Sequence, residues 1–464
     1  MEHKNDIPQL NKTALIAVTM LSNFMNPLMG SAVNIALPKI SAEFSMGAIA
    51  LSWITMSYLL ASAIFLVPFG KIADIYGRRK VFFLGNLFFM LSTFLCSISF
   101  NGMSLIVFRF LQGFAGAMMF STSMALVISA FPLHERGKAI GLNVSAVYIG
   151  LSLAPLLGGL FTEYMGWRSL FYINASVSVL ITAVIYFKIK YEWKEAEGEK
   201  FDFKGTILYM PSIAALMYGF SKLPQMYAII ITLMGLFGLI AFVLIEIKHP
   251  NPVLNIKLFI QNKVFASSNL SAFINYAATF AVGFILSLYL QYVKGMSPKE
   301  AGMLLITQPV LMALVAAIAG RLSDKIKPNW LASAGMAISV AGLFMLSLIG
   351  LETSQHYIII SLAVLGLGFG LFSSPNTNMV MSSVEKKFYG IASATLGTMR
   401  TTGMMFSMAI ASLCVFWFVG KNTINATNIN AFIQSTHLIF IIFTGLCTLG
   451  VFTSFVGKKE LKNI

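Results

Sequence analysis

Two arginines stand inside otherwise apolar stretches, Arg109 in LIVFRFLQGFAGAM and Arg400 in TLGTMRTTG. A charge at the centre of a lipid-spanning helix costs roughly 2.5–3.5 kcal/mol on insertion scales, so each guanidinium needs partners. All 17 acidic residues fall in loops or near the ends of apolar stretches, which leaves no carboxylate to neutralise these charges. A guanidinium has five donors, and the acceptors that remain for Arg109 are the side chains of Asn34 and Gln112, backbone carbonyls and water.

Two interpretations of the arginine pair are open. In the first, each arginine is a satisfied buried group that organises the packing of helices. In the second, both charges face a central aqueous cavity and attract an anionic or electron-rich molecule. The candidate path for such a molecule consists of Asn26, Asn34, Tyr58, Arg109, Gln112 and Arg400.

The composition indicates a membrane protein. Hydrophobic residues make up 57% of the 464 residues and charged residues only 11%, whereas a soluble domain carries about 25% charged residues. Apolar runs of about 20 residues recur along the chain, as in membrane-spanning helices. All three cysteines fall in such runs, so we expect no disulfide framework, no metal site and no cofactor.

Fourteen membrane spans are predicted, so the expected fold is an all-α polytopic membrane protein. The longest polar segment between them, 191–205, is predicted to be a flexible cytoplasmic linker. The spans are predicted near 13–37, 50–70, 81–99, 104–130, 138–161, 169–187, 205–221, 226–245, 265–290, 301–320, 329–350, 357–378, 390–419 and 436–456.

The distribution of basic residues predicts the orientation. With both termini in the cytoplasm, 24 of the 32 lysines and arginines fall in inner segments, six in outer segments and two within spans. This bias obeys the positive-inside rule and predicts a plasma (inner) membrane protein with cytoplasmic termini. The net charge of +15 then reflects topology and contact with anionic lipid headgroups. Nucleic-acid binding is not expected, because it would need a folded basic face.

An internal repeat links the two halves of the chain. GKIADIYGRRK (70–80) and GRLSDKIK (320–327) both place Gly, then Asp four residues later, then basic residues, at an offset of 250 residues. Six spans with their loops occupy about 200 residues, and the excess matches two further spans. The chain is therefore predicted to form two six-helix bundles in parallel pseudo-repeat plus two extra central spans. The domains are an N-terminal bundle (1–190), a linker with the two inserted spans and an inner loop (191–262), and a C-terminal bundle (263–464).

These stretches together resemble the major facilitator superfamily, specifically its fourteen-span drug:proton antiporter branch. GKIADIYGRRK is similar to the family's loop motif between spans two and three, IVFRFLQGFAGA to its span-four motif, and GLSLAPLLGG to its span-five antiporter motif. WITMSYLL, GWRSLFYIN, GLGFGLFSSPNTNMV and GTMRTTG match the branch in spans two, six, twelve and thirteen. The resemblance implies a secondary active transporter that exports amphipathic drug-like compounds by alternating access, in exchange for protons.

The two loop motifs predict a conformational latch at the inner ends of the helices. Its expected members are Gly70, Asp74, Gly77, Arg78 and Arg79, with Gly320 and Asp324 in the second copy. Gly70 would let two helices approach closely, and the acidic and basic residues would hold helix ends together in one of two conformations. An ordinary basic inner loop is the alternative.

The span-five motif predicts a helix that bends and packs closely against a neighbour. Pro155 lacks a backbone donor, and Gly150, Gly158 and Gly159 remove side-chain bulk. A role in antiport and a mere packing kink both remain open for this motif.

One departure from the family bears on proton coupling. Where the branch has an Asp in its first span, this chain has Met29, and the nearest alternative proton carriers are Glu163, Glu300 and His437. The alternative function is therefore an exporter or facilitator of an anionic metabolite without the usual proton coupling, and a further one is a transporter-derived membrane sensor.

An enzyme is not expected, because no nucleophile–base pair or carboxylate pair lies at membrane depth. No phosphate-binding glycine loop is present for direct ATP coupling. The expected partners are a small-molecule substrate, protons and the lipid bilayer.

Overall fold

Every regular element of the described chain is helical, as the sequence predicts. The computed structural model describes residues 11–223, 225–250, 252–254, 256–323, 325–385, 389–420 and 422–455, and only the backbone of residues 133, 134, 136–138, 389 and 390. The first eight helices are α1 Lys12–Phe44, α2 Ala48–Tyr76, α3 Arg78–Ser97, α4 Gly102–Ala130, α5 Leu133–Tyr164, α6 Arg168–Lys188, α7 Phe203–Ser221 and α8 Met226–Glu246. The others are α9 Ile256–Gln261, α10 Lys263–Thr279, α11 Val282–Leu288, the π-helix η1 Tyr289–Val293, α12 Pro298–Leu305, α13 Thr307–Leu322, α14 Pro328–Leu346, α15 Gln355–Ser382, α16 Tyr389–Val419 and α17 Ile429–Phe455.

The predicted number of membrane spans is wrong. Within the described ranges, twelve helices are long and apolar enough to cross a membrane, not fourteen. The other two predicted spans fall on α1 and α7, which are helical but are not among the twelve. Serine, threonine and asparagine side chains and two prolines interrupt the apolar sequence of α1, and α7 has 19 residues with a proline inside.

Two predicted spans are broken into shorter helices. The span predicted at 265–290 consists of α10, α11 and η1, and the one predicted at 301–320 consists of α12 and α13. The second break, at Ile306, has a local cause. Pro309 has no backbone N–H to donate to the carbonyl of Leu305 four residues earlier, and its ring crowds that carbonyl.

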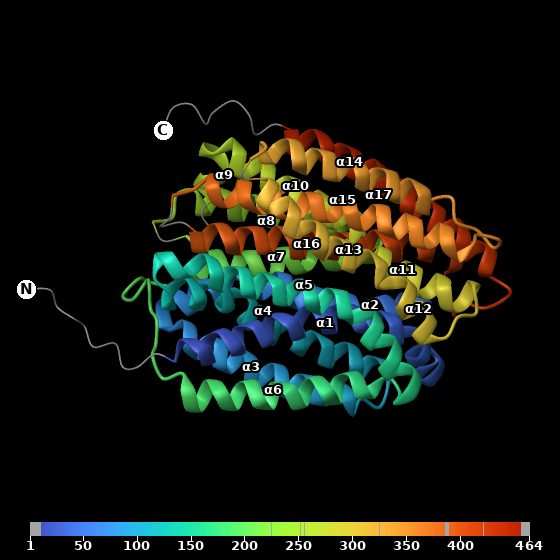
Figure 1. Cartoon of the computed structure of the whole chain (residues 1–464), viewed down its shortest axis with the longest axis horizontal. Helices are drawn as coiled ribbons and strands as arrows, with labels where there is room; N and C mark the ends of the chain where they lie inside the picture. Colours follow the sequence, from blue (N-terminus) through green and yellow to red (C-terminus); the bar gives the residue numbers. More distant parts are fainter. Residues whose placement is uncertain are drawn as a thin grey trace, which may run out of the picture.

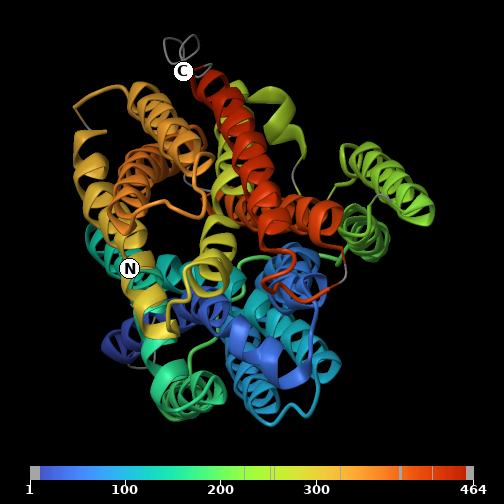
Figure 2. The ribbon, with the colours of Figure 1, turned by 90° about the vertical axis from the view of Figure 1, so that its right-hand side faces the viewer.

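The helices assemble into two groups with a pair at the side (Figures 1 and 2). Helices α1–α6 pack mainly on one another, and so do α10–α17, while α7 and α8 pack as a hairpin that contacts α2 and α16. The two groups meet where α2 contacts α16, where α5 contacts α12 and α13, and where α1 contacts α11 and α12. A site between the groups can therefore draw side chains from both halves of the chain.

The contacts between the groups are not evenly distributed along the helices. We call the end that carries the 189–202 segment the linker end, on the left in Figure 1, and the other the opposite end. In the described part of the chain, hydrogen bonds between the groups lie midway, as for Tyr148 and Ser373 at 2.9 Å, or toward the opposite end, as for Ser52 and Ser412 at 3.1 Å. The opposite end is thus the closed one.

Candidate functional site

A central cavity lies between the two helix groups. Its volume is about 1630 Å³, including the part open to solvent. Both groups supply polar side chains to the wall, among them Asn23, Asn26, Asn34, Ser62, Gln308 and Arg400. Most of the remaining wall is apolar or aromatic, with residues such as Phe120, Phe280, Phe369, Met312 and Met404. This combination suits an amphipathic molecule with a ring system.

Arg109 does not face the cavity. Its side chain on α4 is fully buried, and it does not belong to the cavity wall. Nε donates to the carbonyl of Ile54 on α2 at 3.1 Å, and Nη1 donates to Gln112 Oε1 on its own helix. Nη2 has no hydrogen-bond partner among the described residues. The expected acceptors Gln112 and a backbone carbonyl are thus confirmed, whereas the Asn34 side chain, also expected, accepts from Thr55 instead.

Tyr58 joins the buried arginine to the cavity wall. The Arg109 Cζ atom lies 4.5 Å from the centre of the Tyr58 ring, which fits a cation–π contact. The Tyr58 hydroxyl donates to Asn26 Oδ1, and both Tyr58 and Asn26 line the cavity. Gly116 makes room for this ring, because a Cβ there would lie 3.1 Å from the Tyr58 hydroxyl.

Asn34 belongs to a different network, near the closed end. Its Oδ1 accepts from Thr55 Oγ1 on α2 at 2.8 Å, and its backbone carbonyl accepts from Ser287 Oγ on α11 at 2.8 Å. Gln291 also donates to the neighbouring carbonyl of Ile35 at 3.1 Å. The bonds from Ser287 and Gln291 connect the two groups, so the Asn34 backbone helps to close the cavity toward the opposite end. Thr55 and Ser287 were not found from sequence, because single hydroxyls in apolar helices carry no distinguishing signal.

Arg400 is the arginine that lines the cavity. Nη2 donates to Thr377 Oγ1 on α15 at 2.6 Å, while the buried Nε has no partner among the described residues. Its Cζ atom lies 5.7 Å from the Tyr276 ring, which packs edge-on against Phe369 at 5.2 Å. The two arginines predicted as a pair therefore have different surroundings, since of the two only Arg400 belongs to the cavity wall.

The alternative proton carriers lie outside the cavity. No Asp, Glu or His belongs to its described wall, and Met29 is fully buried outside that wall. Glu300 caps its own helix by accepting from the Ser297 backbone N–H at 2.9 Å, and Glu163 lines a second pocket at the opposite end with it. His437 contacts the carbonyl of Ile349.

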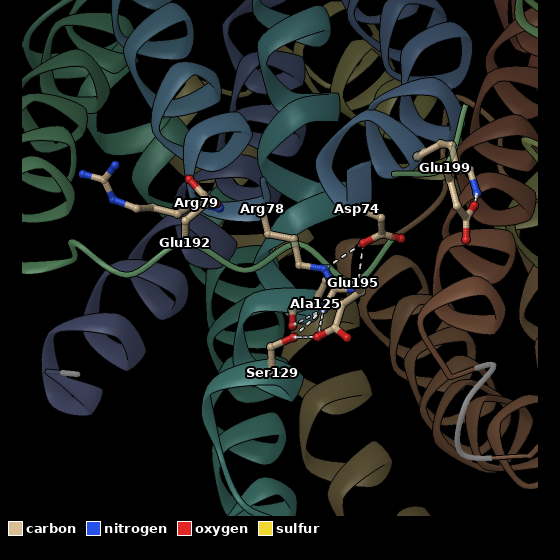
Figure 3. Close-up of polar contacts among 9 residues, drawn as sticks. Asp74, Arg78, Arg79, Ala125, Ser129, Glu192, Glu195 and Glu199 are labelled. Carbon is tan, nitrogen blue, oxygen red and sulfur yellow. Dashed lines mark hydrogen bonds and ion pairs between the residues drawn. The ribbon is translucent and has the colours of Figure 1, made fainter. Parts of the chain in front are cut away.

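Two of the predicted latch residues, Asp74 and Arg78, meet at the linker end (Figure 3). Arg78 donates to Asp74 Oδ1 at 2.7 Å, contacts Ser129 at the end of α4, and forms an ion pair with Glu195 at 3.4 Å. Arg79 points away from this cluster and donates to the carbonyl of Ile189. One arginine, not two, thus joins α2, α3 and α4 at the linker end.

The 191–205 segment is not a free linker. Glu192 accepts from the backbone N–H groups of Arg79 at 2.8 Å and Lys80 at 3.2 Å, which caps α3 from outside its own sequence. The Arg78 N–H donates to the Trp193 carbonyl at 2.9 Å, and Glu199 pairs with Lys71 at 2.6 Å. The polar composition of this segment suggested a flexible connection. Its glutamates instead bind backbone amides and basic side chains of the loop motif.

The motif glycines differ in what they do. Gly77 has φ +128°, a left-handed conformation that favours glycine, and a Cβ there would collide with the Glu192 carboxylate. A Cβ on Gly70 would meet only Ser121 at 3.9 Å, so the close approach predicted there is wrong. In the second copy, a Cβ on Gly320 would lie 2.8 Å from Ser374 Oγ, and Asp324 lies outside the described residues.

The span-five motif sits between the two groups. Gly150 and Gly158 face α1, where a Cβ on Gly158 would lie 3.0 Å from the Ala32 Cα atom. Gly159 faces α12, where a Cβ would lie 3.1 Å from the Lys299 Cα atom, and Pro155 lines the cavity. The close packing predicted for this helix is confirmed, on two neighbours at once.

Known proteins are similar to this chain in sequence. The family model described as Major Facilitator Superfamily matches residues 19–245 and 269–463. The chain is 29% identical over 462 residues to the "Riboflavin transporter RibZ" of Clostridioides difficile, covering 98% of this chain and 99% of that protein. It is 28% identical over 419 residues to the "Multidrug transporter protein MdtP" of Bacillus subtilis, covering 88% and 76% of the two chains.

A solved structure has the same fold. It is a bacterial homologue of the human lysosomal transporter Spinster in an inward-facing and unoccupied conformation, with a TM-score of 0.69 over 96% of both chains. Sequence identity is 15%, so this likeness concerns the fold alone.

Proposed function

This chain belongs to the Major Facilitator Superfamily, and we propose that it is a secondary transporter that exports an amphipathic aromatic compound through the central cavity by alternating access. The observation that carries the proposal is the cavity itself. Amides, a tyrosine and Arg400 stand beside phenylalanines and methionines, and both helix groups contribute to the wall. Such a wall can orient a ring system by a few polar groups while accepting different apolar shapes.

Arg400 gives the proposal a chemical preference, because its side chain is the charged group in the described cavity wall. This guanidinium donor lies beside the aromatic pair Tyr276 and Phe369. A ligand that offers a carbonyl, ring nitrogen or anionic group to this donor and a flat ring to the aromatic pair would satisfy both. We therefore favour electron-rich or anionic ring compounds over simple lipophilic cations.

A riboflavin-like metabolite is the second candidate. The relative named as a riboflavin transporter is similar over nearly the full length of both chains, and riboflavin offers a flat heteroaromatic ring with carbonyl acceptors. The relatives named for multidrug transport support drug-like substrates instead.

The closed end supports one state of an alternating-access cycle, a state that importers and exporters share. On the positive-inside prediction, the linker end with its basic loop motif faces the cytoplasm. The contacts between the helix groups close the opposite end, so the cavity would receive its substrate from the cytoplasm in this conformation. The Asp74–Arg78–Glu195 cluster would hold the inner ends of the first group as a unit while the groups move.

Proton coupling through a cavity carboxylate is not part of this proposal. The described cavity wall has no acid, so a proton gradient would act through a group elsewhere or not at all.

The test is substrate flux in proteoliposomes, with riboflavin and a lipophilic cationic dye as alternative substrates, with and without an imposed pH gradient. We expect saturable riboflavin flux that exceeds dye flux and persists when the pH gradient is collapsed. Dye flux that depends strictly on the gradient would contradict the substrate preference and the coupling together. No flux of any tested compound, with folded protein, would favour the sensor.

A further inference from the structure

Two buried carboxylates meet at the base of the α7–α8 hairpin, away from the cavity. Asp202 directly precedes α7 and Glu246 ends α8, so they stand at the two open ends of the hairpin. Only 3% of the Asp202 surface and 1% of the Glu246 surface is exposed. Figure 2 shows the hairpin beside the main body of helices, so this base lies apart from the proposed transport path.

The two carboxylates face the same point. A Cβ on Gly205 would touch both Glu246 Oε1 and Asp202 Oδ2, so these oxygens flank one position that only glycine leaves open. Asp202 uses its other oxygen, Oδ1, to accept from the Gly205 N–H at 2.8 Å as the cap of α7. Its Oδ2 therefore remains directed toward Glu246.

Within the described ranges, no lysine or arginine forms an ion pair with either carboxylate, and His249 is the one candidate cation beside Asp202. Among the described residues, neither Glu246 oxygen has a hydrogen-bond partner, and the nearby backbone amides of Val253 and Leu254 only partly favour its charged form. The Nδ1 atom of His249 lies 3.7 Å from Asp202 Oδ2, beyond hydrogen-bond distance. The neighbouring Lys204 and Lys248 are exposed.

Two carboxylates that share a buried site cannot both ionise without a positive partner. A hard cation such as Ca²⁺ takes six to eight oxygens, and the described residues contain no group of three or more His, Cys, Asp or Glu that could hold a metal. A single proton needs only the two facing oxygens. The unpartnered, buried Glu246 carboxyl aimed at Asp202 is the independent sign that something is bound there.

We propose that Asp202 and Glu246 bind one proton between them, so that a carboxyl–carboxylate hydrogen bond ties the end of α8 to the start of α7. In this state Glu246 carries the proton and donates it to Asp202 Oδ2, and the pair has a single negative charge. Loss of the proton places two charges at one buried point and loosens the base of the hairpin. Because the folded protein then binds one proton more than the unfolded chain, stability increases as pH falls.

The test is the melting temperature of the purified full-length protein from about pH 8 down to about pH 5. For wild type we expect the melting temperature to rise on acidification by about 2 °C or more. Glu246→Gln and Asp202→Asn should each remove this rise, because an amide supplies the missing donor and Asn still caps a helix. Both variants should be at least as stable as wild type at about pH 8, and the double variant should show no further change in the pH profile.

Three controls separate the alternatives. Glu352→Gln, an exposed acid in another loop, should keep the wild-type pH profile. His249→Gln should keep it as well, and a flat profile in that variant would assign the titration to the histidine and overturn the proposal. A melting temperature of wild type that rises with added Ca²⁺, Mg²⁺ or K⁺, and does not in Glu246→Gln, would overturn it in favour of a cation site.

Discussion

The Cζ atom of Arg109 lies 4.5 Å from the centre of the Tyr58 ring, and the hydroxyl of the same tyrosine reaches Asn26 in the cavity wall. One aromatic side chain thus contacts both the buried Arg109 guanidinium of α4 and a side chain of the cavity wall. Tyr58 makes two contacts that single substitutions can distinguish. Its ring covers the Arg109 guanidinium, and its hydroxyl donates to Asn26.

Tyr58→Phe should weaken substrate binding without loss of folded protein. The ring over Arg109 remains, while the hydrogen bond to Asn26, worth about 1 kcal/mol, is lost. We expect a rise in KM of about fivefold with little change in maximal flux, measured in proteoliposomes. Tyr58→Ala also removes the ring that packs on the Arg109 guanidinium, so the yield of monodisperse protein should fall in that variant. An unchanged KM in Tyr58→Phe would show that Asn26 is held in place by other contacts.

The two arginines should respond differently to the same substitution. Arg109→Lys replaces a fork that donates to Ile54 and Gln112 by a point charge that cannot reproduce it. We expect about a tenfold or greater loss of transport and a lower yield on size-exclusion chromatography. Arg400→Lys should fold normally and change KM and substrate preference, because this side chain lines the cavity. Equal loss of folded protein in both variants would contradict the separation of roles.

The sequence predicts a buried contact well where the partners are close along one helix, and poorly where helices must first meet. Gln112 follows Arg109 by one helical turn, and the contact is as expected. The Ile54 carbonyl and Thr93, which accepts from Gln112 at 2.6 Å, come from other helices, and nothing in their residue types marks them.

The span count was wrong for a related reason. We predicted α1 as one more apolar span, but many of its residues are polar and are buried against other helices. Its serine and asparagine side chains bond to α3 and α5, as Ser22 does to Asn86 at 3.0 Å and Asn23 to Asn143 at 3.0 Å. The linker was likewise misjudged, because the acceptor role of Glu192 depends on the unpaired amides at the start of α3.

Asp74→Asn should impair transport far more than it impairs expression. The amide cannot match the charge-assisted bond to Arg78, so the balance between conformations shifts while the helices remain assembled. We expect flux to fall about tenfold with an unchanged elution profile. Full transport activity in this variant would leave the pair as a surface contact of little consequence.

Glu192→Ala tests the cap that the linker places on α3. Removing two accepted backbone bonds should destabilise the protein by about 1 kcal/mol, which would lower its melting temperature by about 1–2 °C. Glu197→Ala is the matched control, because among the described residues the Glu197 carboxylate pairs with Lys194 inside the same segment. If the control loses as much stability as Glu192→Ala, the linker contributes through its overall charge and not through the cap.

Gly159→Ala should open the closed end of the molecule. A Cβ at this position would press on the Pro298 carbonyl and lie 3.1 Å from the Lys299 Cα atom, where α5 and α12 hold the two helix groups together. The hydroxyl oxygens of Ser52 and Ser412 lie 3.1 Å apart at the same end. Cysteines at both positions would therefore form a cross-link when this end is closed.

In a background without native cysteines, we expect Gly159→Ala to slow oxidative cross-linking of Ser52→Cys with Ser412→Cys and to reduce transport. Gly141→Ala on the same helix, where a Cβ would meet nothing within 4 Å, should change neither. Unchanged cross-linking in Gly159→Ala would mean that the close approach of α5 and α12 does not control this end, and that closure depends on the bonds from Ser287 and Gln291 to α1.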